Sequence, residues 1–163
     1  MFLNDYAKDP KKTSAISGFG VTETDGMLRP GIEEQQLFFP AGILGFPASR
    51  RFRLEKFRPD DGSDSPFMTL RCLDHELSFV VIHPSSLGMD YPMPTHQAML
   101  DTLSASSGDQ LTPLLIVTVR DKIEDITVNL QGPLIINSAS SLGVQHVLEQ
   151  HPLRYPLVRQ VNE

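Results

Sequence analysis

The sequence predicts a mostly β fold: a single antiparallel domain, barrel-like or sandwich-like, with seven or eight short strands and one or two short helices. Apolar segments of strand length recur at regular spacing, and turn-forming Gly and Pro, 11 and 13 in number, separate them. The connections are mostly short, whereas parallel neighbours need a crossover of about a dozen residues or more. Only residues 84–113 could supply one, so antiparallel pairing is expected.

Composition divides the chain into three parts. Its 163 residues lie within the usual range for one domain. Residues 1–31 are rich in Lys, Ser, Thr, Gly and Asp with little periodicity, which predicts a flexible N-terminal arm that can include a short strand near 19–22. The β-barrel domain is expected over 32–158, and a tail over 159–163.

The first half of the domain contains four predicted strands, at 36–39, 52–57, 67–73 and 77–83. Over 52–57 apolar and polar side chains alternate, as in a strand with one buried face. The segment 77–83 is apolar almost throughout, which predicts a strand buried on both faces. Only three polar residues separate it from the strand before, and this spacing is the strongest hairpin signal in the chain.

The second half begins with a predicted short helix from Thr95 to about Leu103. Thr95 can cap this helix, and Ala98, Met99 and Leu103 are expected on one apolar face. Further strands are predicted at 114–119, 126–130, 134–137 and 144–148. The sequence from His151 onward is polar and contains two Pro residues, and no strand is predicted there.

Composition argues against a membrane protein and against a nucleic-acid binder. No run of about 18 apolar residues occurs, and the N-terminus lacks the pattern of a secretory signal. The single cysteine, Cys72, excludes an internal disulfide, which agrees with a cytoplasmic protein. The net charge of −6 repels both nucleic acid and anionic membranes.

One basic cluster interrupts this acidic character. It consists of Arg50, Arg51, Arg53, Lys56 and Arg58, which alternate with apolar residues. A two-residue period is typical of the solvated face of a strand. Contact with an anion or a protein partner is the alternative interpretation.

No motif for catalysis or cofactor binding is present. Gly18 and Gly20 lack the third glycine and the helix of a dinucleotide loop, and neither a Walker A loop nor a G-x-S-x-G elbow occurs. The five histidines have no spacing that would place two ligands on one helix face. We therefore expect neither a metal nor a cofactor, and a binding protein rather than an enzyme.

Cys72 is the one candidate nucleophile, because His75 follows three residues later and could activate it. Strand alternation favours a structural thiol, since Cys72 would face the same way as Met68 and Leu70. A small hydrolase or transferase that uses Cys72 and His75 remains an alternative function.

Two turns carry apolar side chains, at 43–46 and 89–93. Both are expected to fold back as lids on the barrel ends, because aromatic side chains are usually buried. An exposed apolar patch for a protein partner is the alternative.

Motifs in a fixed order resemble the FliW family over about residues 36–157. The turn FPAGILGF matches the family pattern FPxGxxGF, and Pro66 to Phe79 is similar to the family hairpin PF…LQSLDDPELAF. The other matches are Pro84 with Asp-Tyr at 90–91, TVNLQGPLIIN at 127–137, GVQHVL at 143–148 and Tyr155 with Pro-Leu at 156–157.

This chain departs from the family pattern at a few positions. Val128 and Gly132 replace small Ala residues, and His75 stands where Pro or another polar residue is common. The arm that precedes residue 32 is longer than in most members.

The resemblance implies a cytoplasmic flagellar assembly factor that binds flagellin and also binds CsrA, a small dimeric RNA-binding translational repressor. Binding of CsrA would free flagellin mRNA from repression, and rising free flagellin would restore it. The partners are then flagellin and a CsrA-type regulator, without direct contact to nucleic acid or membrane, and the free protein is expected to be a monomer. A regulatory module that uses the N-terminal arm and not flagellin is a second alternative.

Turn residues are the candidate contacts with partners. Asp74 and Glu76 lie at the predicted hairpin tip, where acidic groups would steer association with a basic protein. The remaining candidates come from the turns and motifs described above: Phe46, Asp90, Tyr91 and Asn129. The amides of Asn129 and Asn137 are also expected to bond neighbouring backbone.

Overall fold

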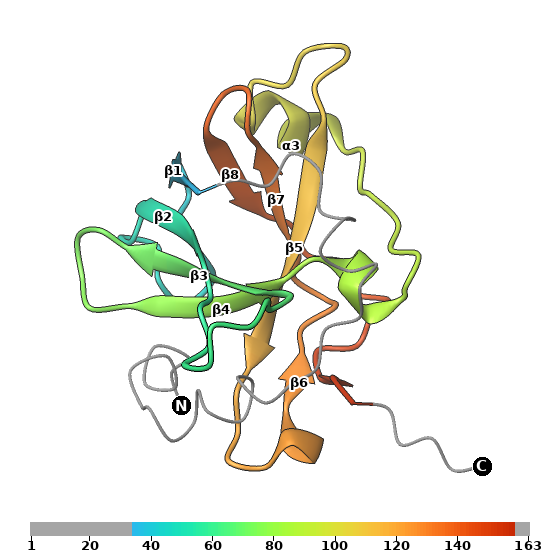
Figure 1. The fold of residues 1–163 in the computed structure, drawn as a ribbon. Coiled ribbons are helices and arrows are strands. Elements are labelled where there is room, and N and C mark those ends of the chain that lie inside the picture. Colours follow the sequence, from blue (N-terminus) through green and yellow to red (C-terminus); the bar gives the residue numbers. More distant parts are fainter. Residues whose placement is uncertain (1–33, 159–163) are drawn as a thin grey trace.

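Seven strands of one sheet close into a barrel (Figure 1). The structure, a computed structural model, describes residues 34–158. The barrel closes because β4 pairs with β3 on one side and with β5 on the other, so the order β4-β3-β2-β1-β8-β7-β5 returns to its start. The predicted arm at 1–31 and the tail at 159–163 lie outside the described residues.

Strands β1 to β8 each overlap a predicted segment, but β8 begins and ends earlier than the predicted 144–148, β5 begins three residues earlier than predicted, and β6 keeps only two of its five predicted residues. Strands β6 and β9 extend the sheet beyond β5, outside the closed ring. The bounds are β1 (Gln35–Phe38), β2 (Arg51–Lys56), β3 (Phe67–Cys72), β4 (Ser78–Ile82), β5 (Leu111–Thr118), β6 (Thr127–Val128), β7 (Leu134–Asn137), β8 (Leu142–Gln145) and β9 (Tyr155–Pro156). The mostly β fold, its barrel and the hairpin between β3 and β4 are confirmed.

One joint of the barrel is parallel, which the prediction of an antiparallel domain did not include. Strands β1 and β8 run in the same direction and meet at a single pair, Phe38 and Leu142. The backbone N–H of Phe38 donates to the carbonyl oxygen of Ser141 at 2.9 Å. Next to this joint the ring of Phe39 lies so close to Gly143 that a Cβ there would be 2.5 Å from Cζ. Every other strand pair in the described part is antiparallel.

The barrel interior is filled by aromatic and aliphatic side chains from all sides, which we call the interior cluster. On β2 the inward residues are Phe52 and Leu54, and both are fully buried. On β3 the inward residues are Met68, Leu70 and Cys72, as strand alternation predicts. This cluster holds the ring closed and sets which side chains point outward.

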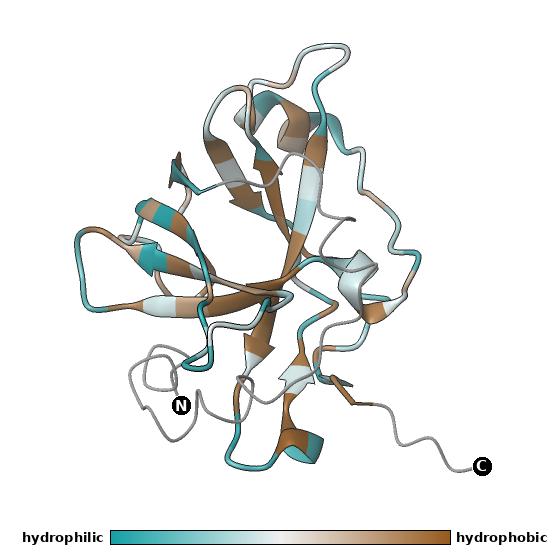
Figure 2. Ribbon diagram, in the orientation of Figure 1, coloured by the Kyte–Doolittle hydropathy of each residue, from teal (hydrophilic) through white to brown (hydrophobic). Residues whose placement is uncertain are grey.

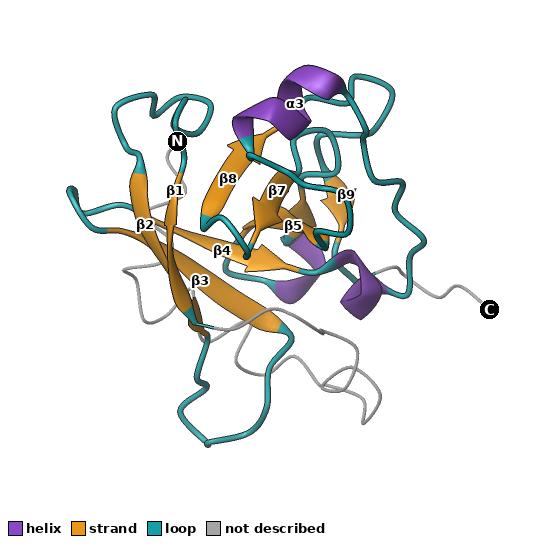
Figure 3. Cartoon of the chain, turned by 90° about the horizontal axis from the view of Figure 1, so that it is seen from above, coloured by secondary structure: helices purple, strands orange, loops and turns teal. Residues whose placement is uncertain are grey.

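Two further apolar clusters cover parts of the barrel from outside. One packs the outward side chains of β4 and β5 against β6, Leu157 and the 3-10 helix η2 (Pro84–Leu87). Strand β4 is therefore apolar on both faces, as predicted, and it is coloured as apolar along much of its length in Figure 2. The other cluster lies beneath helix α3 (Gln97–Thr102), which covers β7 and β8 at the top of the view in Figure 3.

The helix predictions were partly wrong. The N-cap residue is His96, without a side-chain cap bond, and not Thr95. Met99 and Leu103 are buried as predicted, but Ala98 is exposed because the six-residue helix turns it away from the barrel. A second 3-10 helix, η3 (Ile123–Asp125), was not predicted.

The polar segment after His151 contains a strand, β9, that the sequence did not predict. Strand β9 pairs with β6, where Thr127 lies opposite Pro156 and Val128 opposite Tyr155. Strand β6 lies inside the predicted segment 126–130, whereas β9 is only two residues long and includes a Pro, so no periodic pattern marks it in the sequence.

Candidate partner-binding surface

The tip of the β3–β4 hairpin is exposed and carries the acidic candidates. The N–H of Cys72 donates to the carbonyl of Leu77 at 2.8 Å and closes the turn. The Arg51 guanidinium donates through Nε to both carboxylate oxygens of Asp74, at 3.1 and 3.3 Å. This hydrogen bonding holds the pKa of Asp74 below its ordinary value. Asp74 is therefore charged at neutral pH and fixed against β2, while Glu76 lies exposed on the same tip.

Phe46 lies at the same end of the barrel and covers the interior cluster. Its ring meets that of Phe79 edge-on, with centroids 5.6 Å apart and planes at 76°. The neighbouring Ile43 is buried, whereas Leu44 is 65% exposed. The turn thus folds back as the predicted lid and leaves one apolar side chain in solvent.

The other candidates lie on the outer side of the barrel, where Tyr91 packs against the apolar cluster outside β4 and β5 and the N–H of Asn129 donates to the carbonyl of Ile116 on β5. The hydroxyl of Tyr91 donates to the carbonyl oxygen of Leu130 at 2.6 Å, and its ring packs beside that of His151, with centroids 5.4 Å apart. Asp90 is exposed next to it. Asp74 and Glu76 thus share the hairpin tip and Phe46 covers the interior cluster, whereas Tyr91 belongs to a different apolar cluster.

Asn129 bonds within its own turn, as expected from the sequence. Its Oδ1 accepts from the backbone N–H groups of Gln131 and Gly132, both at 2.9 Å. Asn137 likewise donates through Nδ2 to the carbonyl of Leu103 at 3.1 Å and accepts from the N–H of Ala139 at 3.1 Å. These amides shape the turns on either side of β7.

Replacement of Tyr91 by phenylalanine should remove an unusual phenol titration. Burial raises the pKa of Tyr91 from 10.0 to about 12. The neutral phenol is therefore favoured by folding, and its contribution to stability is complete below pH 10 and lost as pH rises through 12. In an ultraviolet pH titration, Tyr91→Phe should lack the high-pH step of the wild type, and its unfolding free energy should fall by about 0.5–1.5 kcal/mol. A step that persists in the variant would contradict this assignment.

The outward side of β1–β3 forms a charged surface that we call the arginine face. Its members alternate with residues of the interior cluster, so their side chains point away from the barrel. They are Gln36, Phe38, Arg51, Arg53, Glu55, Thr69 and Arg71. The basic cluster predicted as a solvated strand face is thus divided, because Arg51 and Arg53 belong to this surface and meet Arg71 from β3.

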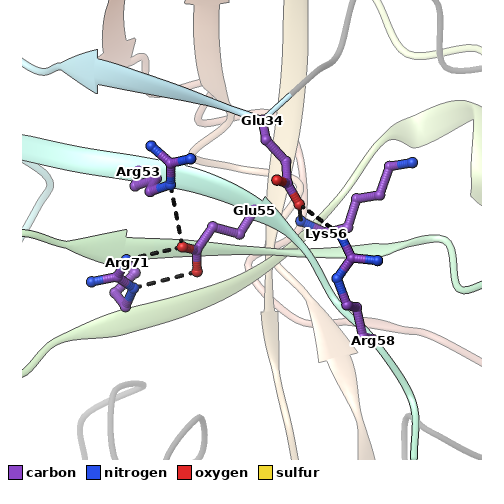
Figure 4. A network of polar contacts seen from close by, with 6 residues as sticks. All are labelled: Glu34, Arg53, Glu55, Lys56, Arg58 and Arg71. Atoms are coloured by element: carbon purple, nitrogen blue, oxygen red, sulfur yellow. Dashed lines mark hydrogen bonds and ion pairs between the residues drawn. The ribbon is translucent and has the colours of Figure 1, made fainter. Parts of the chain in front are cut away.

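Glu55 lies between two arginines on this face, as Figure 4 shows. Arg71 donates through Nε to Oε1 at 3.3 Å and through an Nη atom to Oε2 at 2.9 Å. Arg53 approaches the same Oε2 with its Nε at 3.4 Å. The hydrogen bond from Arg71 is the main reason that the pKa of Glu55 lies below its ordinary value. One carboxylate is therefore shared by two guanidinium groups.

Glu34 makes a second polar contact at the end of β2 (Figure 4). Its Oε2 accepts from the backbone N–H of Lys56 at 3.1 Å and from an Nη atom of Arg58 at 3.3 Å. A small hollow opens beside these basic residues, between the end of β2 and the start of β3, with Phe57 and Phe67 among its lining residues. Its position at the end of the barrel is separate from the arginine face.

The geometry does not favour Cys72 as a nucleophile. Its side chain faces the barrel interior and is 4% exposed, whereas His75 lies in solvent at the hairpin tip. Within residues 34–158, no group of three or more His, Cys, Asp or Glu side chains could hold a metal ion. The described part of the chain also contains no helix that is long and apolar enough to cross a membrane.

Sequence reasoning missed the joint role of Arg53, Glu55 and Arg71. The alternation after Arg51 correctly indicated outward basic side chains on β2, and partner contact was one interpretation of them. Arg71 joins this set only through strand register, which places it opposite Arg53. No local pattern in the sequence specifies that pairing.

Comparison with known proteins gives one consistent family. The model of the FliW protein family matches residues 23–157. The flagellar assembly factor FliW of Caldanaerobacter subterraneus subsp. tengcongensis is 30% identical over 132 residues, which cover 79% of this chain and 86% of that protein. The flagellar assembly factor FliW of Desulfitobacterium hafniense is 35% identical over 127 residues, with coverage of 76% and 81%.

A solved structure shares the fold as well. The crystal structure of the flagellar assembly factor FliW superposes with a TM-score of 0.68 at 26% sequence identity. The match covers 87% of this chain and 92% of that one. The family match over residues 23–157 includes the barrel and all the candidate residues.

Proposed function

This chain belongs to the FliW family, and we propose that it is a cytoplasmic flagellar assembly factor that acts by binding other proteins. The observation that carries the proposal is the extent of the family match, residues 23–157, which contains the barrel together with every turn that holds a candidate contact. We further propose that its partners are flagellin and a CsrA-type translational repressor.

Charge supports the second partner. The chain has a net charge of −6, whereas a repressor that binds RNA presents basic surface. Opposite fields accelerate the encounter of two proteins and orient them before contact. The fixed carboxylate of Asp74 and the neighbouring Glu76 place negative charge on a protruding turn, where a partner meets it early.

In this proposal the two partners compete for the protein in a regulatory cycle. While the protein holds the repressor, flagellin mRNA is translated. When free flagellin accumulates it takes the protein away, and the released repressor returns to the mRNA. The chemistry required is reversible protein binding, and no bond in either partner is made or broken.

The burial of Cys72 supports a binding role over the hydrolase or transferase alternative. A nucleophile must reach its substrate and contact an activating base, whereas the thiol of Cys72 points into the interior cluster. Cys72→Ala should therefore bind partners as the wild type does. Loss of a measurable turnover in that variant would favour the enzyme.

Co-elution of purified proteins tests the proposal directly. The full chain is mixed with flagellin, or with CsrA, from the same organism and passed over a sizing column at low salt. A complex with each partner at micromolar concentration is the expected result. If neither partner shifts the elution at that concentration, the proposed function is wrong.

Charge reversal at the hairpin tip should slow association with CsrA. In the double variant Asp74→Lys and Glu76→Lys the steering field reverses, so the association rate should fall about tenfold and depend less on salt. The matched control reverses Glu124 and Asp125 on η3, which changes the net charge equally at another place. Equal association rates for the two double variants would show that CsrA contacts a surface other than the hairpin tip.

A further inference from the structure

The side chains of the arginine face lie in rows that run across the strands. Strand register places Gln36, Arg53 and Arg71 in one row on β1, β2 and β3. The adjacent row pairs Phe38 with Arg51. Because directly paired residues in a sheet point to the same side, these groups form one continuous surface.

Positive charge exceeds negative charge on this surface. Arg53 and Arg71 share the single carboxylate of Glu55, and Arg71 takes both of its oxygens. Arg53 has one contact at 3.4 Å to an oxygen that Arg71 already uses, and its side chain is 39% exposed. One guanidinium charge is thus left without its own counter-ion, on a protein whose net charge is negative.

An exposed aromatic ring borders the arginines. Phe38 is 41% exposed on β1 and lies opposite Arg51, which the hairpin residue Asp74 binds from the side. Phenylalanine and arginine are both enriched in protein interfaces, where arginine binds carboxylates with its planar fork. The surface thus offers apolar contact beside a pair of carboxylate-binding groups.

We propose that the arginine face docks an acidic segment of a protein partner, with a partner carboxylate between Arg53 and Arg71 and an apolar partner side chain on Phe38. The inference rests on the proposed function and assigns this face to flagellin, because a basic RNA-binding repressor is repelled by it. The carboxylate of Glu55 within this surface and that of Asp74 at its border, together with the net charge of the chain, oppose a phosphate backbone.

Glu55 has a defined part in this arrangement. It occupies the fork of Arg71 in the free protein, so a partner carboxylate has to compete with it. Removing its charge should therefore tighten partner binding, whereas a purely structural role for the Arg71–Glu55 pair predicts no gain. This opposite direction of effect distinguishes docking from structural support.

The test compares four forms of the full chain in equilibrium titrations against purified flagellin and, separately, against CsrA. They are the wild type, the double variant R53E with R71E, the variant E55Q, and a control double variant, K122E with R154E, at exposed positions near η3 and β9. Both double variants change the net charge equally. Urea unfolding of each form checks that the barrel is intact.

R53E with R71E should weaken flagellin binding about tenfold or more and leave CsrA binding as strong as in the wild type. The control should remain within about twofold for flagellin, and E55Q should tighten flagellin binding about threefold. Equal flagellin affinity for the wild type and R53E with R71E, while the wild type binds both partners, overturns this inference and leaves the proposed function standing. Wild-type protein that binds neither partner overturns both.

A third titration tests RNA as a ligand of the arginine face. A fluorescently labelled single-stranded RNA is titrated with the wild type and with R53E plus R71E, and no binding is expected at micromolar protein. RNA binding that depends on these arginines would make the surface a nucleic-acid site and overturn the proposal.

Discussion

Phe79→Ala is expected to lower the free energy of unfolding by about 3–5 kcal/mol. The ring of Phe79 is 1% exposed and lies inside the barrel between the rings of Phe46 and Phe52, with centroids at 5.6 and 6.2 Å. Its removal leaves a cavity that the closed barrel cannot collapse to fill, because strands hydrogen-bonded on both sides resist movement. Urea unfolding measures the loss as a lower midpoint at unchanged slope.

Phe38→Ala is the matched control for this measurement. Phe38 is also a strand phenylalanine, but it is 41% exposed on the outward side of β1. Its replacement should change stability far less, because little apolar surface is returned to water. A midpoint for Phe79→Ala equal to that of the wild type would refute its place in the core.

The second large effect is expected at Gly42, in the turn between β1 and β2. Gly42 has φ of +71°, and a Cβ there would lie 2.6 Å from the carbonyl oxygen of Phe46 and 2.7 Å from Cα of Pro47. These contacts are to backbone, so an alanine could be accommodated only by moving the turn. Displacement of Phe46 would also loosen its packing on Phe79.

Gly45→Ala separates the two causes of this effect. Gly45 also has a positive φ, of +88°, but nothing lies within 4 Å of a Cβ built there. It should therefore show only the conformational penalty, about 1–2 kcal/mol, whereas Gly42→Ala should exceed it clearly. Equal urea midpoints for the two variants would mean that the clash at Gly42 is relieved at little cost.

The sequence predicted the elements whose cause is local. The β3–β4 hairpin follows from two apolar segments separated by three polar residues, and the two-sided burial of β4 follows from its unbroken apolar run. Strand β9 and the N-cap His96 were not predicted, because their cause is not local. Each exists because the rest of the barrel positions that piece of backbone, and tertiary context overrides propensity.

The same distinction holds for the candidate surface. Exposure of Asp74 and Glu76 follows from their place in a tight turn, which the sequence specifies. Two contacts depend on how β2 pairs with its neighbours: the bond from Arg51 to Asp74, and the sharing of Glu55 by Arg53 and Arg71. Partner contacts built from several strands are therefore visible only once register is known.

The parallel joint between β1 and β8 has a consequence for how the protein is made. Its two partners, Phe38 and Leu142, are separated by most of the chain, so β8 leaves the ribosome long after β1. Until then the β1–β4 part of the nascent chain has an unpaired edge and exposes apolar side chains that the finished barrel encloses. The interval between synthesis of β4 and of β8 is thus the period in which this chain is most vulnerable to aggregation.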